Sequence, residues 1–310
     1  MAKVFIDGSA GTTGLRIYDR LSARDDISLI ILPDEIRKDT AARKEAINNA
    51  DIVFLCLPDD AAREAVTLLE NKNTVIIDTS TAHRTLEGWT YGLPELDGMR
   101  DKIKNAKLIA NPGCHASGFI ALIKPLIDKG VLNKDAYLSS FSITGYSGGG
   151  KKRIAEYEDP DRNKLWGAPS QYALGQTHKH LKEMMAITGL KTTPAFCPII
   201  ADFYSGMEVT IPLFKKDLTT DLQGIKDIYK SYYNSKIIHY NENVEVNGCL
   251  SALALSGRDD MEITVYGNED RILVIARYDN LGKGASGSAI QNMNIVLGVD
   301  ETTGLITEEI

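Results

Sequence analysis

The chain has 310 residues, of which 43% are apolar and 25% are charged, and its net charge is -7. This composition is typical of a globular protein with room for two domains, and the absence of a basic stripe argues against a nucleic-acid partner. No run of 18 apolar residues and no signal-peptide pattern occurs, so we expect no membrane partner. The four cysteines (56, 114, 197 and 249) lack CxxC spacing. We therefore expect reduced thiols in the cytoplasm and no metal site.

The first 110 residues alternate short apolar runs with helical patterns. Strands are predicted over 3–7, 27–32, 51–57, 74–78 and 107–110, and helices over 12–23, 39–49 and 58–71. Continuous apolar runs of this length are typical of parallel strands that are buried on both faces. The pattern predicts an α/β domain with a Rossmann-type doubly wound parallel sheet.

The pattern changes after Cys114. Helices are predicted over 114–129 (kinked at Pro125), 178–188, 221–233 and 282–298, strands over 137–145, 207–214, 261–266 and 271–278, and a polar, glycine-rich loop up to about 171. This order indicates a second, α+β domain with an antiparallel or mixed sheet. We expect the last helix to return to the first domain, which would then comprise 1–113 and about 282–310, with 114–281 as the second domain.

The stretch "GSAGTTG" lies between the first predicted strand and the first helix. Its residues are Gly8, Ser9, Ala10, Gly11, Thr12, Thr13 and Gly14. Backbone N–H groups at such a helix start can hold a pyrophosphate, and glycine lets the ligand approach closely. We interpret the stretch as a dinucleotide-binding loop; the alternative is an ordinary strand-to-helix turn.

The residues that would distinguish NAD from NADP are ambiguous. Asp34 and Glu35 lie about twenty residues beyond the loop, where an NAD enzyme binds the ribose 2′-hydroxyl. Arg37 and Lys38 follow directly and could pair with a 2′-phosphate instead. Spacing alone leaves both cofactors open.

Cys114 stands in "ANPGCHASG", where a predicted strand ends and a helix begins. A thiol at a helix N-terminus has a lowered pKa and becomes a reactive thiolate. We interpret Cys114 as a nucleophile, and the other three cysteines as small buried hydrophobic residues. A nucleophilic cysteine beside a nicotinamide indicates a thioester that is formed or consumed by hydride transfer.

Two further stretches could complete such a site. In "GQTHKHLKE", His178 and His180 are candidates for the general acid/base, and Glu183 could orient His180 on a helix. The alternative is a pair of surface histidines. In "TGYSGGGKKR", the hydroxyl of Ser147, the backbone at Gly148 and the Lys151 cation could bind a phosphate or carboxylate. The alternative is a mobile loop with solvated lysines.

Motifs along most of the chain resemble the N-acetyl-gamma-glutamyl-phosphate reductase family, which is related to aspartate-semialdehyde dehydrogenase. "GSAGTTG" resembles the family's GASGYTG, "DTSTAHR" its DLSADFR, "NPGC" its NPGCYPT, "TGYSGGGKK" its SGVSGAGRK and "HKHLKE" its HRHTPE. "YGLPEL" looks the same as the family form, and the segment 279–305 is close to the family's C-terminal signature. Two departures are "CHASG" after the nucleophile and a histidine in "STAHR" where phenylalanine is usual.

The resemblance implies a fold, an activity and site residues. Cys114 would carry the acyl group, His178 or His180 would be the acid/base, and Asn111 of the "NPGC" motif would lie at the substrate. "YDN", which ends at Asn280, resembles the motif of glyceraldehyde-3-phosphate dehydrogenase whose asparagine holds the nicotinamide amide. The family uses NADPH to reduce N-acetyl-L-glutamyl 5-phosphate in arginine biosynthesis, and its second domain binds substrate and forms dimers or tetramers.

Two alternatives remain open from the sequence. The same chemistry could act on aspartyl phosphate or on an aminoadipyl phosphate, because one methylene shifts specificity by only about 1–3 kcal/mol. The chain could also be a non-catalytic NADP-binding regulator, since fold does not imply function.

Overall fold

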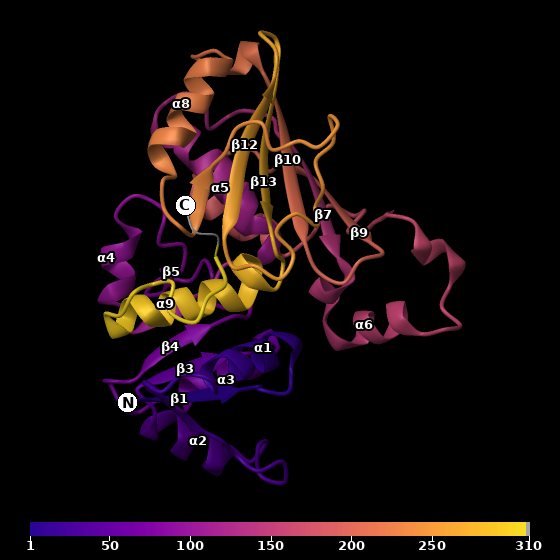
Figure 1. The fold of residues 1–310 in the computed structure, drawn as a ribbon. Helices are drawn as coiled ribbons and strands as arrows, with labels where there is room; N and C mark the ends of the chain where they lie inside the picture. The colour runs from indigo at the N-terminus through magenta and orange to yellow at the C-terminus, as the bar shows by residue number, and fades with distance from the viewer. Residues whose placement is uncertain (308–310) are drawn as a thin grey trace. The chain divides into compact units, whose positions relative to one another are not determined.

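The computed structural model describes residues 1–307, which fall into two compact units (Figure 1). Unit 1 comprises Met1–Gly113 and Ala285–Leu305, and unit 2 comprises Cys114–Gly284 and, within the described part of the chain, residues 306–307. No helix within residues 1–307 has the length and apolar character needed to cross a membrane.

Unit 1 is built on a six-stranded sheet in the order β2-β1-β3-β4-β6-β5, in which every pair is parallel. Its elements are β1 (Ala2–Asp7), α1 (Thr12–Leu21), β2 (Ile27–Ile30), α2 (Thr40–Asn49), β3 (Ile52–Leu55), α3 (Asp59–Thr67), β4 (Val75–Asp78), β5 (Thr90–Tyr91), α4 (Met99–Lys104), β6 (Leu108–Ala110) and α9 (Gly287–Leu297). The prediction of a doubly wound parallel sheet is confirmed, although β5 and α4 were not predicted.

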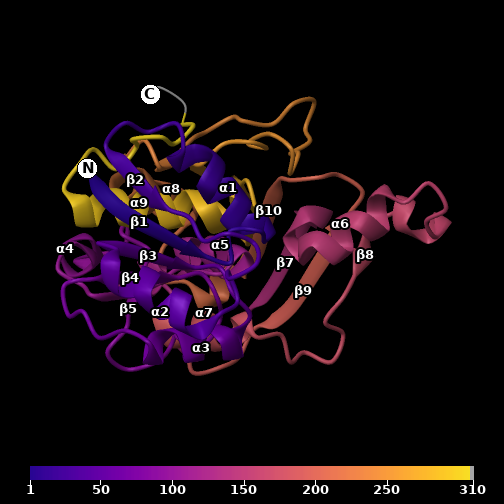
Figure 2. The same ribbon diagram turned by 90° about the horizontal axis from the view of Figure 1, so that it is seen from below.

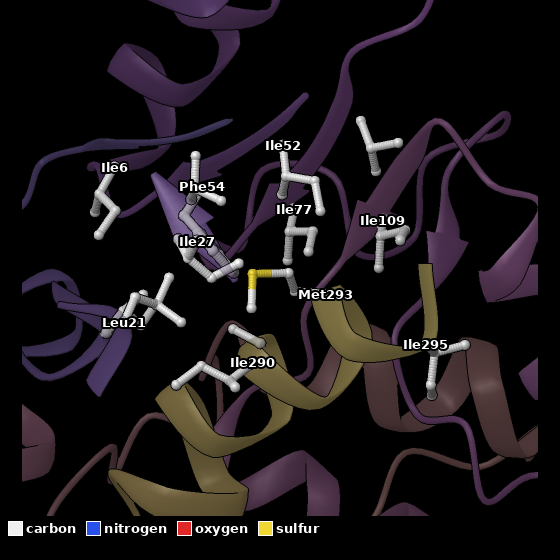
Figure 3. Packing of buried hydrophobic residues seen from close by; sticks show 14 of the residues in the cluster. Ile6, Leu21, Ile27, Ile52, Phe54, Ile77, Ile109, Ile290, Met293 and Ile295 are labelled. Atoms are coloured by element: carbon white, nitrogen blue, oxygen red, sulfur yellow. The ribbon is translucent and has the colours of Figure 1, made fainter. Parts of the chain in front are cut away.

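Both faces of this sheet are buried, which explains the continuous apolar runs. On one face, residues of α1, α4 and α9 pack against the strands; Figure 3 shows Met293 of α9 beside Ile77 of β4. On the other face, Ile47 of α2 and the alanines of α3 pack against the sheet. The C-terminal helix therefore belongs to the core of unit 1.

Unit 2 contains a seven-stranded mixed sheet in the order β11-β12-β13-β10-β7-β9-β8. Its strands and α-helices are α5 (Cys114–Asp128), β7 (Ser139–Gly145), α6 (Gly150–Glu158), β8 (Ser170–Gln171), α7 (His180–Thr188), β9 (Ala195–Ala201), β10 (Met207–Phe214), α8 (Leu222–Tyr232), β11 (Ile238–Tyr240), β12 (Met261–Gly267) and β13 (Arg271–Tyr278). The β7–β9 and β11–β12 pairs are parallel and the remaining pairs antiparallel. The predicted mixed sheet is confirmed.

Helix α5 runs through Pro125, which has no N–H to donate to the carbonyl of Ala121. The hydroxyl of Tyr233 donates to that carbonyl at 2.8 Å, and the hydroxyl of Tyr229, on α8, donates to the carbonyl of Leu122. Twelve residues of the helix are buried, so a carbonyl left without a donor would be costly. The two tyrosines make a proline compatible with a buried helix.

The predicted loop up to residue 171 is wrong, because the segment contains helical turns at Tyr146–Gly149 and Lys164–Gly167 as well as α6 and β8. Figure 2 shows that the segment containing α6 projects away from strands β7 and β8. Stacked rings stabilise the segment: Tyr157 lies 4.8 Å from Tyr146 and 5.4 Å from Trp166 between ring centroids. Arg162 pairs with Asp202 at 2.5 Å, and this ion pair connects the segment to the chain directly after β9.

Other predicted boundaries also need correction. The helix predicted from 178 begins at His180, the helix predicted over 58–71 ends at Thr67, and β9 was not predicted. Helix α9 begins at Gly287, and the predicted residues before it, Gly282–Ser286, form a π-helix. A single π turn of this kind is frequent at functional sites.

Candidate active site

The glycine loop of unit 1 has the geometry of a phosphate cradle. Gly8 has φ +90, and a Cβ there would lie 2.3 Å from the carbonyl oxygen of Cys56. A Cβ at Gly14 would lie 2.4 Å from the carbonyl oxygen of Gly8, so both positions require glycine. Gly11 is the N-cap of α1, and the buried hydroxyl of Thr12, the first residue of that helix, has no hydrogen-bond partner among the described residues. A helix start with an unsatisfied hydroxyl fits a pyrophosphate group.

A cavity of about 310 Å³ adjoins this loop within unit 1. Its lining includes Gly8, Ser9, Arg37 and Lys38 together with the end of β2. Asp34 instead extends into solvent, with an 88% exposed side chain whose carboxylate lies 3.3 Å from the guanidinium of Arg37. The two cations are therefore placed to meet a ligand in this cavity.

Under the loop, Arg43 and Asp7 form a buried ion pair. The Arg43 Nε donates to Asp7 Oδ2 at 3.0 Å. Burial raises the pKa of Asp7, and the hydrogen bond and charge of Arg43 work against that increase. The pair holds the end of β1 against α2, and Arg43 also lies 3.5 Å from the carboxylate of Glu64.

In unit 2, Cys114 is the first residue of α5, and its surroundings fix its backbone. The hydroxyl of Tyr278 donates to the carbonyl of Cys114 at 2.6 Å and accepts from the N–H of Gly118 at 3.1 Å. A Cβ at Gly284 would lie 3.0 Å from the Cβ of Cys114, so the π-helix approaches the nucleophile closely because it carries glycine there. Cys114 is partly exposed, as a nucleophile must be.

His115 lies at the centre of a cluster of rings. Its ring centroid is 5.8 Å from that of His178 and 5.6 Å from that of His180. Its Nδ1 lies 2.7 Å from the hydroxyl of Ser142, and its Nε2 lies 2.6 Å from the hydroxyl of Tyr172. Burial first, and the charge of His178 second, lower the pKa of His115 from 6.5 to about 3. The structure thus brings His178 and His180 to the residue that follows Cys114.

The two candidate histidines differ in environment. His178 is partly exposed, and its Nδ1 accepts the backbone N–H of His180 at 3.2 Å. His180 is buried, and its Nε2 lies 4.0 Å from the carboxylate of Glu183, which is also buried. Because its Nδ1 accepts the backbone N–H of His180, the neutral form of His178 carries its proton on Nε2.

The predicted phosphate-binding stretch starts at the end of β7. Ser147 is buried, and its hydroxyl accepts from Asn280 Nδ2 at 3.0 Å, while Asn280 Oδ1 accepts the N–H of Gly206 at 2.9 Å. A Cβ at Gly148 would lie 3.3 Å from Asn280 Nδ2. Lys151 is exposed in the first turn of α6. The structure joins Asn280 to Ser147 and gives both a part in holding this turn; their predicted ligand contacts remain predictions.

Asn111 in unit 1 has similar internal contacts. Its Nδ2 donates to the carbonyl of Ala285 at 3.0 Å, and its Oδ1 accepts from Asn292 Nδ2 at 3.3 Å. Arg84 donates to the Asn111 carbonyl at 2.9 Å. These bonds tie the end of β6 to α9, and the predicted substrate contact of Asn111 remains a prediction.

Sequence reasoning missed several residues of the site, namely Tyr172, Ser142, Tyr278, Gly284 and the neutral His115. The prediction that Cys249 is buried is wrong, since its thiol is exposed, and Cys56 and Cys197 are intermediate. Two of them had a sequence signal: Tyr278 belongs to the "YDN" stretch from which Asn280 was chosen, and His115 lies in "CHASG", the departure from the family motif.

In comparisons with known proteins, parts of both units match domain families of the semialdehyde dehydrogenases. Residues 33–106 match the family described as semialdehyde dehydrogenase, NAD binding domain, and residues 114–280 match semialdehyde dehydrogenase, dimerisation domain. The solved structure of aspartate semialdehyde dehydrogenase II from Vibrio cholerae has a TM-score of 0.73 at 15% identity, covering 96% of this chain and 98% of that one.

Two curated relatives are much more similar in sequence. N-acetyl-gamma-glutamyl-phosphate reductase 2 of Nostoc sp. is 43% identical, covering 98% of this chain and 99% of its own. N-acetyl-gamma-glutamyl-phosphate reductase of Brucella ovis is 44% identical, covering 96% of this chain and 99% of its own. The chain belongs to the N-acetyl-gamma-glutamyl-phosphate reductase family.

Proposed function

We propose that the protein reduces N-acetyl-L-glutamyl 5-phosphate to N-acetyl-L-glutamate 5-semialdehyde and phosphate in arginine biosynthesis, with NADPH as the reductant. The observation that carries the proposal is the placement of Cys114, partly exposed at the first residue of a buried helix, in a chain of this family. Four free cysteines suit a cytoplasmic enzyme, where we place the reaction.

Cys114 acts as the nucleophile. Its sulfur attacks the acyl carbon and displaces inorganic phosphate, which leaves a thioester on the protein. When bound, NADPH supplies the hydride that reduces the thioester carbonyl. The resulting thiohemiacetal takes up a proton on its oxygen, and its collapse returns that proton, releases the aldehyde and restores the Cys114 thiolate.

We assign the proton transfer to His178 rather than to His180. His178 is partly exposed, and its Nδ1 accepts the backbone N–H of His180, so Nε2 is the nitrogen to which we assign the proton transfer. His180 is buried beside Glu183 and supports the cluster from within. A general acid/base must have a nitrogen that the substrate can reach.

The glycine loop and the cavity beside it support NADPH as the reductant. Gly8, Gly11, Gly14 and Thr12 form the phosphate cradle, with Ser9 and Thr13 in the same loop. Arg37 and Lys38 line the cavity, and a 2′-phosphate is the ligand group that two cations favour there. Asp34, exposed beside Arg37, is an unsuitable partner for a buried ribose hydroxyl.

We propose that Lys151 binds an anionic group of the substrate and that the turn at Ser147 and Gly148 supports this contact. Lys152 and Arg153 both lie within ion-pair distance of Glu156, whereas Lys151 points from the first turn of α6 into solvent. A substrate with a carboxylate and a phosphate offers two groups that such a cation can bind.

We further propose a homo-oligomer that forms through the sheet of unit 2. Alternate residues of β10 are buried under helices, while Glu208, Thr210, Pro212 and Phe214 face the other side. Phe141 on β7 and Leu273 on β13, on the same side, are 44% and 38% exposed. A partly exposed sheet face that carries Pro212, Phe214, Phe141 and Leu273 beside polar residues, in a unit that matches a dimerisation domain, fits a second copy of the chain.

The test is the reverse reaction, followed as NADPH absorbance with N-acetylglutamate semialdehyde, phosphate and NADP. We expect phosphate-dependent turnover that Cys114→Ala lowers about 10³-fold or more. Cys249→Ala, which alters an exposed thiol, is the matched control and should keep full activity. Turnover with aspartate semialdehyde alone would move the enzyme to another pathway, and turnover with NAD as fast as with NADP would refute the cofactor assignment.

A further inference from the structure

The segment that leads into His178 contains two residues with a left-handed backbone. Ala173 has φ 52° and Gln176 has φ 55°. The other non-glycine residues of this kind in the described part of the chain are Asn243 and Asn247, and asparagine adopts the conformation more readily than alanine or glutamine. Such a backbone costs free energy and persists where the surrounding contacts impose it, often at functional sites. The contacts of Gln176 show what imposes it here.

The side chain of Gln176 is bound to the main chain of Phe196 on β9. Its Nε2 donates to the carbonyl of Phe196 at 2.7 Å, and its Oε1 accepts the N–H of Phe196 at 2.8 Å. Strand β8 pairs with the end of β9, and the N–H of Tyr172 extends this pairing to the carbonyl of Pro198 at 3.0 Å. At Phe196 the amide takes the place of a strand residue, because it offers one donor and one acceptor as a backbone does. We call this pair of hydrogen bonds the Gln176 clamp.

Phe196 connects the Gln176 clamp to His178. The centroid of its ring lies 5.2 Å from that of His178, in an edge-to-face contact, and 5.3 Å from that of His115. His178 follows Gln176 by two residues, and its Nδ1 accepts the N–H of His180. Gln176 thus binds the main chain of the same residue whose ring contacts His178. Chain connectivity and ring contact together fix the position of His178 relative to β9.

The other end of the segment is held by Tyr172. Its hydroxyl lies 2.6 Å from Nε2 of His115, and its N–H is bound to β9 as described above. The chain from Tyr172 to Gln176 is therefore fixed at both ends, and the left-handed residue Ala173 lies between them. A short segment held in this way has little freedom to move the histidine that follows it.

We propose that Gln176 is a positioning residue, whose clamp on β9 and left-handed backbone hold His178 where it transfers the proton. The inference rests on the proposed role of His178 as the acid/base. A clamp that only completed the edge of the sheet would stabilise the fold without affecting His178, so the test has to separate position from stability.

The position of His178 can be measured by NMR of the protein isotopically labelled at the histidine Cε1 atoms, which gives one signal for each of the five histidines. His178→Ala identifies the His178 signal by its loss. An aromatic ring shifts the signals of protons beside it, so the His178 signal reports its contact with Phe196. This measurement needs neither substrate nor cofactor.

Gln176→Asn shortens the amide by one methylene and keeps a residue that tolerates a left-handed backbone. The shorter amide cannot reach Phe196, so the His178 signal should move to the position of an exposed histidine. In the turnover assay kcat should fall about 10-fold or more, because displacing a group by about 1 Å can cost about 10²-fold in rate. The KM values should change by less than about twofold, since the groups that bind the substrate and the cofactor remain.

Gln176→Gly separates the amide from the strained backbone. Glycine adopts the left-handed conformation without strain, so this variant loses the hydrogen bonds and not the backbone geometry. It should displace His178 and lower kcat as Gln176→Asn does.

Asn268→Ala is the matched control in the turn between β12 and β13. The Asn268 Oδ1 accepts the N–H of Asp270 at 3.0 Å and that of Arg271 at 2.9 Å, so this variant also removes two hydrogen bonds between a side-chain amide and the backbone. It should leave the His178 signal and kcat unchanged. Denaturant unfolding of the variants shows that each one is folded and compares their losses of stability.

An unchanged His178 signal in Gln176→Asn and Gln176→Gly would overturn the inference. A loss of kcat in Asn268→Ala equal to that in Gln176→Asn would also overturn it, since the loss would then follow stability alone. A displaced His178 signal with full turnover would refute the proton-transfer role of His178 and leave its positioning by Gln176 intact.

Discussion

The hydroxyl of Tyr278 is inserted between the carbonyl of Cys114 and the N–H of Gly118, the two groups that would bond directly in an undisturbed first turn of α5. The insertion is possible because residue 118 is glycine, where a Cβ would lie 2.7 Å from the Tyr278 oxygen. A side chain inserted into a helical ladder changes the local backbone direction. Here the inserted hydroxyl ties the first turn of α5, which begins with the nucleophile, to β13.

Tyr278→Phe should therefore lower both activity and stability. The carbonyl of Cys114 and the N–H of Gly118 would lose their shared partner, which costs about 1–3 kcal/mol of unfolding free energy and shifts the nucleophile. We expect kcat to fall more than KM rises. Denaturant unfolding and steady-state kinetics measure the two effects.

Tyr233→Phe is the matched control for this variant. It removes a tyrosine hydroxyl from the same helix, at the carbonyl of Ala121, with a similar loss of stability. Its kcat should remain near that of the wild type. Equal losses of kcat in both variants would show that Tyr278 only stabilises the fold.

Replacing Arg37 and Lys38 together by alanine should change cofactor preference. Loss of the charge-assisted contacts should raise the KM for NADPH by about 10- to 100-fold and leave the KM for NADH nearly unchanged. Arg63→Ala is the control, because Arg63 is half-exposed on α3 and pairs with Asp60. An equal effect on both cofactors would place the two cations elsewhere than at the 2′-phosphate.

The buried His115 should make stability depend on pH. Its pKa of about 3 is below the 6.5 of an exposed histidine, so the unfolded chain binds the proton more tightly. The contribution is complete above pH 6.5 and is lost as the pH falls from 6.5 towards 3. Over that range the wild type should lose up to about 1.4 kcal/mol per pH unit more than His115→Gln.

The relevant measurement is denaturant unfolding of both proteins between pH 7 and pH 4.5. His178 and His180 face the same ring and remain in both proteins, as does Tyr172, so their contributions cancel in the difference. Parallel stability curves for the two proteins would contradict the prediction.

The sheet face of unit 2 can be tested by adding charge. Phe141→Glu combined with Leu273→Glu should weaken self-association by about 30-fold or more, since central apolar contacts dominate such interfaces. Light scattering after size-exclusion chromatography measures the change. Leu86→Glu, at a 55% exposed position of unit 1, is the control and should not alter the oligomeric state.

The parts of the fold that depend on local pattern could be predicted from the sequence. The apolar runs of unit 1 reflect burial on both faces, and Gly8 and Gly14 reveal a close backbone approach, because each property is visible within a few neighbouring residues. The helices of the segment 146–171 were not predictable, since two glycines precede α6, a third is its first residue, and the stabilising stack joins Tyr157 to rings outside that helix.

The hydrogen bonds of the site were beyond sequence reasoning for a different reason. Tyr278 is 164 residues from Cys114, and Tyr172 is 57 residues from His115. No periodicity or spacing links such pairs, because the sheet and helices of unit 2 bring them together. A histidine after the nucleophile looked like a departure from a motif, and only its contacts reveal a neutral connector.

The proline in α5 has a consequence for how this sequence can change over generations. Pro125 leaves the carbonyl of Ala121 without a helical donor, and Tyr233 supplies one. Loss of the Tyr233 hydroxyl should be harmful while the proline is present and nearly neutral once Pro125 has become alanine, which restores the missing N–H. The two positions are therefore epistatic, and drift at one is permitted or forbidden by the state of the other.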